Sequence, residues 1–230
     1  MARLLRICPP GIPQHVIQRG NNRNICFASE QDFSAYANWL KEYSHKFDVA
    51  IHAWVFMTNH VHLLVTPTSS EGVSTMMQAL GRRYVRYFNH EYRRTGTLWE
   101  GRFKSSLVQS EDYLLQCYRY IELNAIRADM VDDPSKYVWS SYRCNGLGIE
   151  TDLCTPHDEY LKLGKSKEKR QLAYRALFKA HVDGELLEQI RGSVNKGLAL
   201  GDDRFKDEVE ALYGRRLRQA KMGRPRESRI

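Results

Sequence analysis

The chain has 230 residues, of which 42% are hydrophobic and 11% aromatic, and it carries a formal net charge of +8. This composition excludes a wholly disordered protein, because enough apolar side chains are present to bury a core. No apolar run is long enough to cross a bilayer, and the positive charge favours a polyanionic partner. Six of the eight net charges fall within residues 214–230, so the remainder of the chain is nearly balanced.

The N-terminal residues and the cysteines indicate a cytoplasmic protein. The opening "MARLLRICPPG" has only a short apolar stretch, interrupted by Pro9 and Pro10, which does not fit a secretory signal. The five cysteines are odd in number and form no Cys-x-x-Cys pair. We therefore expect reduced thiols, not a disulfide framework or a zinc knuckle, and no membrane partner.

The first part of the chain alternates strand and helix signals. Residues 13–22 predict a strand, and residues 29–47 predict a helix with Ser29 as its N-cap. Residues 49–67 contain two β-rich runs around Thr58-Asn59, which predicts a hairpin. Side chains alternate along a strand, so His60 and His62 of the second run point to the same face.

Residues 72–96 predict an amphipathic helix, whose apolar face lies opposite Arg82, Arg86 and Arg93. A loop and a short strand follow within residues 97–109. The next helix is predicted over residues 110–131, with Ser110 as N-cap and Glu111 and Asp112 in its first turn.

The C-terminal third is predicted to be helical. Residues 144–156 are rich in turn formers and suggest a soft boundary, after which three helical segments follow, over 166–182, 184–194 and 202–214. The order of elements predicts an α+β fold, with a central antiparallel β-sheet and packed helices. We expect one domain over residues 1–146, a helical region over 147–213 and a basic, disordered tail over 214–230.

The pair His60 and His62 is the first chemical signal. Two imidazoles on one strand face can bind one divalent cation, which needs at least a third ligand. Taken alone, a His-x-His pair is a weak signal, because most such histidines lie at the surface or are satisfied in the core.

The helix over residues 110–131 presents a second group of side chains. A helical wheel gives a buried stripe of Leu114, Tyr118, Ile121, Ala125 and Ala128. At the edge of this stripe the wheel brings together Tyr113, Tyr120, Asn124 and Arg127. Tyr120 and Asn124 are four residues apart and therefore neighbours. By spacing alone, an ordinary helix flank is the commoner explanation.

Four motifs together resemble a known family. "HVIQRGNNRNICF", "MTNHVHLLV", "LWEGRFKSSLV" and "YLLQCYRYIELNAIRADMV" occur in this order. They resemble the single-tyrosine HUH transposases, and more closely the REP-associated tyrosine transposases, over about residues 13–142. The resemblance implies the ferredoxin/RRM-like sheet of the HUH fold. It also implies a protein of the bacterial cytosol or nucleoid that works as a monomer or a homodimer.

The resemblance also implies the chemistry. His60, His62 and Asn124 would bind one Mg²⁺ or Mn²⁺, and Tyr120 would be the nucleophile. The reaction would cleave single-stranded DNA near a REP-like hairpin through a 5′-phosphotyrosine and then reseal a strand. Thr58 and Ala125 stand where the family usually has proline, which puts local geometry in question but replaces no ligand.

The expected DNA contacts come from cationic, aromatic and loop residues. They are Arg19, Asn22, Arg23, Arg82, Arg86, Trp99, Arg102, Lys104, Arg127, Arg224 and Arg226. The alternatives are a solvated arginine face on the helix and a core position for Trp99. The Arg-Pro-Arg of the tail fits a narrow minor groove, although an unspecific basic tail is the simpler interpretation.

Two rival functions remain open at this level. One is a catalytically silent DNA-binding regulator on the same fold, which the presence of all four site residues disfavours. The other is a metal-dependent nuclease that uses water and needs a carboxylate base. Glu122 is the only acid nearby on the helix, and it is predicted to point away from Tyr120 and Asn124.

Overall fold

A computed structural model describes residues 6–179 and 184–218. The strands and long helices of the first part follow the predicted order: β1 (Gln14–Arg19), α1 (Glu30–Lys46), β2 (Val49–Met57), β3 (His60–Pro67), α2 (Gly72–Glu91), β4 (Lys104–Leu107) and α3 (Ser110–Glu122). The strands form one antiparallel sheet in the order β2-β3-β1-β4. The predicted α+β fold is confirmed.

Local signals explain several boundaries. The Ser29 side chain accepts from the Asp32 backbone N–H, and the Asp32 carboxylate accepts from Ser29 in return, so the predicted N-cap is a full capping box. The β2–β3 hairpin turns at Thr58 and Asn59 as predicted. The Thr58 carbonyl accepts from the backbone N–H groups of Cys26 and Phe27, so the turn is held without a proline.

The helix carrying Tyr120 differs from the prediction at both ends. Its N-cap is Gln109, not Ser110, although Glu111 and Asp112 do lie in the first turn. Leu123 interrupts the predicted helix, and a short helix α4 (Asn124–Arg127) follows. The chain leaves helical geometry after Arg127, and Ala128 is exposed instead of extending the buried stripe.

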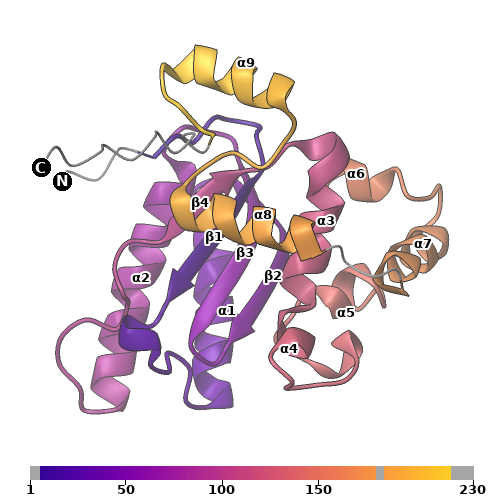
Figure 1. Ribbon diagram of the computed structural model, residues 1–230. Helices are drawn as coiled ribbons and strands as arrows, with labels where there is room; N and C mark the ends of the chain where they lie inside the picture. Colours follow the sequence, from indigo (N-terminus) through magenta and orange to yellow (C-terminus); the bar gives the residue numbers. More distant parts are fainter. Residues whose placement is uncertain (1–5, 180–183, 219–230) are drawn as a thin grey trace, which may run out of the picture.

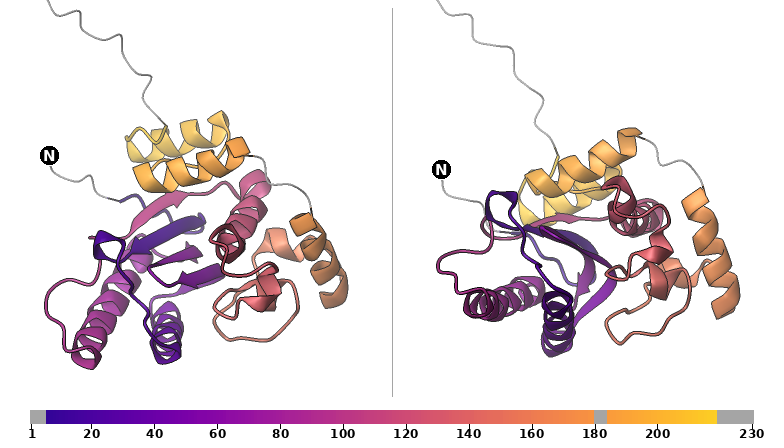
Figure 2. Two further views of the ribbon diagram at one scale, coloured as in Figure 1. Left: turned by 60° about the horizontal axis from the view of Figure 1, so that its bottom comes forward. Right: turned by 90° about the horizontal axis from the view of Figure 1, so that it is seen from below.

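The sheet lies between two helical layers (Figures 1 and 2). Helices α1 and α2 cover one face, and α3 and α8 (Gly184–Lys196) cover the other. Because strand side chains alternate, each strand contributes side chains to both layers. Val61, Leu63 and Val65 of β3 pack in the α1/α2 layer, whereas Leu64 packs against α3.

The remaining elements are mostly short helices: η1 (Asn21–Arg23), η2 (Pro134–Lys136), α5 (Tyr142–Asn145), α6 (Asp158–Leu161), α7 (Lys167–Lys179) and α9 (Asp203–Tyr213). Three buried C-terminal residues, Tyr160, Tyr174 and Ile190, belong to the same core cluster as Tyr118 of α3. The described helices beyond residue 147 therefore pack on the sheet domain.

The start of the predicted tail is ordered, contrary to expectation. Leu217 is 2% exposed, and its carbonyl accepts from the Ala199 N–H at 2.8 Å. An apolar side chain at this position explains why the chain stays attached to the core. Arg224 and Arg226 lie outside the described residues. Within the described ranges, none of the helices has the length and apolar character to cross a membrane.

Candidate active site

The two histidines lie on the sheet face covered by α3 and α8. In the β1–β3 register, His62 pairs with Ile17 and His60 pairs with Arg19. Directly paired residues of antiparallel strands point to the same face. The register therefore places Arg19, one of the expected DNA contacts, beside His60.

Each histidine is oriented by a hydrogen bond at Nδ1. His62 Nδ1 lies 2.8 Å from His15 Nε2, and His60 Nδ1 lies 2.6 Å from the Asn59 carboxamide oxygen. Within the described residues, Nε2 of neither histidine has a hydrogen-bond partner. An imidazole held at one nitrogen and open at the other is the usual arrangement of a metal-binding histidine.

The surroundings keep the imidazoles neutral. Burial, and then the Arg19 guanidinium, lowers the pKa of His60 to about 4. Burial, then His15 and His60, lowers the pKa of His62 well below its usual value. Only a neutral imidazole can donate its lone pair to a cation, so both residues are in the ligating form at neutral pH.

Tyr120 lies directly against this pair. Tyr120 is only 5% exposed. Its ring centroid lies 5.7 Å from that of His62 and 5.6 Å from that of His15. The Arg127 guanidinium lies 4.4 Å from the Tyr120 ring centroid and also bonds to the Tyr120 carbonyl. Burial raises the pKa of Tyr120, while Arg127 and a hydrogen bond from Arg191 oppose that rise.

Asn124 is hydrogen-bonded to the last turn of α3. Its amide nitrogen donates to the carbonyls of Tyr120 and Ile121, at 3.0 and 3.1 Å. These bonds leave the carboxamide oxygen as the remaining acceptor, which is the atom a hard divalent cation would use. The donor set of two neutral imidazole nitrogens and one amide oxygen therefore fits a weakly held divalent ion. No group of three or more His, Cys, Asp or Glu side chains among the described residues could hold a metal.

Two residues of this site escaped prediction. His15 on β1 orients His62, and its own Nδ1 is buried without a partner. Arg191 on α8 opposes the rise in the pKa of Tyr120. The alternation of side chains along β1 would have predicted a contact between His15 and His62 only if the pairing of β1 with β3 were known. No local signal marks Arg191, because 71 residues separate it from Tyr120.

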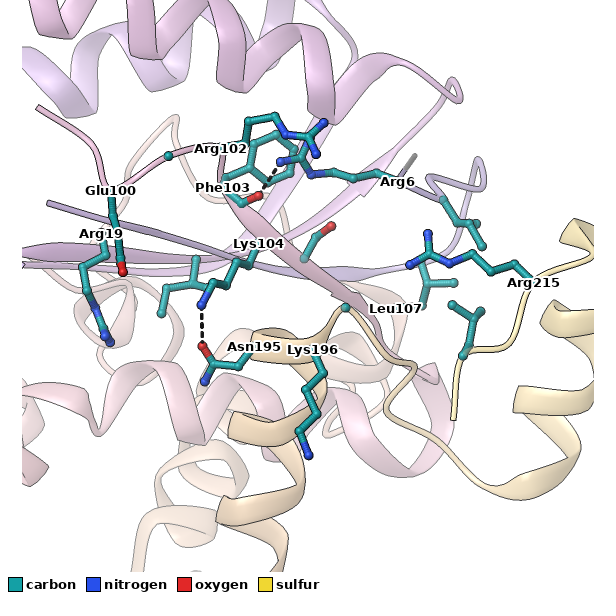
Figure 3. Close-up of a pocket in the computed structure, with 16 residues that line it drawn as sticks. Arg6, Arg19, Glu100, Arg102, Phe103, Lys104, Leu107, Asn195, Lys196 and Arg215 are labelled. Carbon is teal, nitrogen blue, oxygen red and sulfur yellow. Dashed lines mark hydrogen bonds between the residues drawn. The ribbon is translucent and has the colours of Figure 1, made fainter. Parts of the chain in front are cut away.

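A basic groove of about 500 Å³ lies next to this site, between β4, the N-terminal segment and the end of α8 (Figure 3). Its walls contain one acid, Glu100, and the six cationic residues Arg6, Arg19, Arg102, Lys104, Lys196 and Arg215. Lys104 donates to the Asn195 carboxamide at 3.1 Å. Arg19, which lowers the pKa of His60, is therefore shared by the groove and the histidine pair.

The other expected DNA contacts are divided between the surface and the core. Asn22 and Arg23 are exposed in the loop after β1, where the Arg23 carbonyl accepts from the Asn59 side chain at 3.0 Å. Arg82 and Arg86 are exposed and line a second hollow with Arg102. For Trp99 the structure favours the alternative of a core position over a DNA contact. Trp99 is 6% exposed and stacks on Tyr84 inside the core, so its faces are occupied.

Glu122 lies away from the histidine pair, as predicted. Its carboxylate accepts from Ser141 at 2.5 Å, from Asn145 at 2.8 Å and from Tyr174 at 2.7 Å. Burial raises the pKa of Glu122 to about 7, although the three hydrogen bonds oppose the shift. A carboxylate enclosed by these donors is not available as a base beside His60 and His62.

Comparison with known families gives the class of this protein. Residues 11–124, about half of the chain, match the family model described as "Transposase IS200 like". The chain belongs to the IS200-like transposases. It is therefore an enzyme of the transposase class, and the matched segment includes β1 to β4, the whole of α3 and the residues His60, His62, Tyr120 and Asn124.

One solved structure agrees with this assignment at the level of the fold. A structure described as a REP-associated tyrosine transposase bound to a REP hairpin matches with a TM-score of 0.52 and 16% identity. The match covers 68% of this transposase and 93% of that chain. A candidate transposase from Deinococcus radiodurans R1 has 23% identity, a TM-score of 0.37 and coverage of 53% and 96%. No curated protein sequence matches this chain.

Proposed function

We propose that this transposase cleaves and rejoins single-stranded DNA beside a hairpin, with Tyr120 as its nucleophile. The observation that carries the proposal is the direct packing of Tyr120 on His62, whose outward nitrogen is open. In the cleavage step the Tyr120 oxygen forms a bond to the scissile phosphorus. The bond from phosphorus to the 3′ oxygen breaks, and that oxygen takes up a proton.

His60, His62 and Asn124 would hold one Mg²⁺ or Mn²⁺ in this proposal. A divalent ion bound there would polarise the scissile phosphate and offset its negative charge. The residues themselves supply the support for this assignment. Each histidine is fixed at Nδ1 and neutral, and the Asn124 amide nitrogen is already engaged, so its oxygen is left for the ion.

Arg127 is placed to assist at the same point. Its guanidinium covers the Tyr120 ring at 4.4 Å, and its Nη1 is buried without a hydrogen-bond partner. A buried, unpaired guanidinium nitrogen is costly, and a bound phosphate oxygen would satisfy it. We therefore assign Arg127 to the scissile phosphate.

The basic groove gives the single strand a path to Tyr120. Its cations come from the N-terminal segment, β1, β4, α8 and the residues after α9, and Arg19 connects them to His60. A groove with one acid and six cations suits a phosphate backbone, whose binding depends on charge and not on base identity. The exposed loop with Asn22 and Arg23 adjoins the hairpin turn at Asn59 and would contact bases near the cleavage point.

A gel experiment tests the proposal. The protein is incubated with Mg²⁺ and a labelled hairpin oligonucleotide that carries single-stranded flanks, and products are separated under denaturing conditions. We expect a covalent protein–DNA band that disappears in Tyr120→Phe. Tyr113→Phe, a change on the same helix, is the matched control and should keep the band. Cleavage that persists in Tyr120→Phe would point to a nuclease that uses water, and binding without cleavage would point to a regulator.

A further inference from the structure

The loop between β1 and α1, residues 20–27, is attached to the hairpin turn that precedes the two histidines. At one end of the loop, Gly20 donates its backbone N–H to the Asn59 carbonyl at 2.8 Å. At the other end, Cys26 donates its backbone N–H to the Thr58 carbonyl at 2.9 Å. Because β3 begins directly after this turn, the β1–α1 loop is attached at the base of the strand that carries both histidines.

Two consecutive residues of the β1–α1 loop have a left-handed backbone. The φ angle is 52° at Asn22 and 60° at Arg23. Asparagine is often found in this region but arginine is uncommon there, so the conformation persists only where the surroundings hold it. One contact that holds it is the bond from the Asn59 side-chain amide to the Arg23 carbonyl, at 3.0 Å. This bond joins the exposed middle of the loop to a side chain of the turn.

The Asn59 carboxamide is bonded at both of its ends, and its partners fix its orientation. The Arg23 carbonyl can only accept, so the end that faces it must be the amide nitrogen. The carboxamide oxygen then lies 2.6 Å from His60 Nδ1, and because this oxygen also can only accept, Nδ1 must carry the proton. Nε2 of the neutral ring therefore keeps its lone pair. Through one side chain, a loop carbonyl determines which nitrogen of His60 can bind a cation.

The second histidine is held differently. His62 Nδ1 lies 2.8 Å from His15 Nε2, and a neutral imidazole nitrogen can either donate or accept, so this partner does not by itself fix the tautomer of His62. His15 is also a buried residue of β1 and not part of an exposed loop. Within the residues that the structure describes, the link to an exposed loop distinguishes His60 from His62.

We propose that Asn59 is a positioning residue that couples DNA bound at the β1–α1 loop to the divalent ion bound at His60. The inference rests on the proposed function, which assigns both ligands. DNA that contacts Asn22 and Arg23 would hold the Arg23 carbonyl against Asn59 and thereby keep His60 in its ligating tautomer. The Nδ1–H of a His60 that binds an ion is in turn a stronger donor to the Asn59 oxygen, which strengthens the bond from the amide to the loop. Coupling of this kind is reciprocal, so each ligand raises the affinity for the other.

Two substitutions at Asn59 separate the two ends of the carboxamide. Asn59→Leu keeps the approximate shape and removes both hydrogen bonds. Asn59→Asp keeps an acceptor for His60 Nδ1 but has no N–H for the Arg23 carbonyl. Asn89→Leu is the matched control, because Asn89 is also half-buried and its side chain donates to a loop carbonyl, that of Gly96, at 2.9 Å. Thermal melting checks that each variant is folded.

The first measurement is made without metal. The protein is labelled with ¹⁵N at histidine and treated with a chelator, and NMR at a pH where the imidazoles are neutral reports the tautomer of His60. We expect a protonated Nδ1 and a bare Nε2 in the wild type and in Asn89→Leu. Asn59→Leu should populate the other tautomer, and Asn59→Asp should restore the first. A wild-type His60 that is protonated at Nε2 would overturn the inference.

The second measurement is the affinity for Mn²⁺, determined by EPR with and without a hairpin oligonucleotide. The phosphate that is cleaved in the gel experiment is replaced by an uncharged methylphosphonate, which removes the direct attraction between the ion and that phosphate. We expect the oligonucleotide to raise the Mn²⁺ affinity at least about fivefold in the wild type and in Asn89→Leu.

The two variants at Asn59 should differ from each other. Asn59→Leu should weaken Mn²⁺ binding about tenfold, because the ligand His60 loses its fixed orientation, and should also lose the gain from the oligonucleotide. Asn59→Asp should bind Mn²⁺ at least as tightly as the wild type, because it keeps the acceptor for Nδ1 and adds a negative charge. It should nevertheless lose the gain, because its bond to the Arg23 carbonyl is missing.

The contrary outcomes are separate from a failure of the proposed function. An oligonucleotide effect that is absent in the wild type, or unchanged in Asn59→Asp, would reject the coupling through Arg23. Equal Mn²⁺ affinities of Asn59→Leu and Asn89→Leu would reject Asn59 as a positioning residue. Failure of the proposed function would appear in the gel experiment, as no adduct or as an adduct that survives in Tyr120→Phe, while the tautomer of metal-free His60 still depended on Asn59.

Discussion

The two faces of the sheet are built on different principles. The face under α1 and α2 is closed by aromatic packing, in which Tyr36, Phe56 and Tyr84 meet edge to face at ring-centroid distances of 5.0 and 5.2 Å. The face under α3 and α8 buries His15, His62 and Tyr120, and it leaves His15 Nδ1 and Arg127 Nη1 without partners. Buried polar atoms without partners also occur on the first face, as at Tyr36 and Trp99, so the second face differs in that its imidazoles, phenol and guanidinium lie together, which suits it to chemistry.

The largest effect on activity is expected from a change on the α3/α8 face, at His60. His60→Ala should lower formation of the phosphotyrosine adduct about a thousandfold, equivalent to about 4 kcal/mol, because it removes one proposed ligand of the ion. The half-buried side chain contributes little packing, so the melting temperature should stay close to that of the wild type. His90→Ala, a change at an exposed histidine of α2, is the control. A loss below tenfold would remove His60 from the metal site.

A change on the other face should have the opposite outcome. Leu40→Ala removes a fully buried side chain of α1 from the aromatic core. We expect a loss of about 2–5 kcal/mol in the free energy of unfolding, measured with urea, and normal adduct formation by the protein that remains folded. Leu172→Ala, at an exposed position of α7, should change stability by less than about 0.5 kcal/mol. Equal effects of the two changes would refute the assigned core.

A smaller effect is expected on the pH dependence of stability when His15 is replaced. Burial, and then Arg127, lowers the pKa of His15 to about 3 in the folded protein, whereas the pKa in the unfolded chain is near the ordinary histidine value of 6.5. Between these values the unfolded chain binds more protons, so folding loses stability as pH falls below about 6.5. Relative to His15→Gln, the wild type should lose about 2 kcal/mol between pH 7 and pH 5. Parallel stability curves would contradict the buried, neutral imidazole.

The weakest effect concerns the groove. Lys104→Ala should reduce affinity for single-stranded DNA modestly and lower the slope of log affinity against log salt by about 0.7. Lys169→Ala, at an exposed lysine of α7 away from the groove, should leave that slope unchanged. Filter binding across a range of salt concentrations measures both. An identical slope in the two variants would mean that the single-stranded DNA does not bind in the groove.

The sequence predicted the parts of this architecture that depend on local patterns. The order of strands and helices, the hairpin at Thr58 and the Ser29 cap followed from periodicity and capping chemistry. The break at Leu123 was missed, although Asn124 is a weak helix former whose side chain donates to the carbonyls of Tyr120 and Ile121 at the end of α3.

The site was predictable only as far as motifs reach. His60, His62, Tyr120 and Asn124 came from spacing and from the family resemblance, and the structure brings Tyr120 against His62. His15 and Arg191 depend on strand register and on the docking of α8, which no local pattern encodes. At Trp99 the local pattern misled, because this aromatic residue among cations lies in the core.

The buried Glu122 has a consequence for when this protein becomes active during its synthesis. Its third hydrogen-bond donor, Tyr174, is added 52 residues after Glu122. While a ribosome is still making the chain, the end of the tyrosine helix holds a carboxylate that lacks this partner. The helix therefore gains this anchor only when α7 has left the ribosome, and the packing of α8 on α3 follows later still, so a nascent chain that already contains Tyr120 does not yet hold it in its final position.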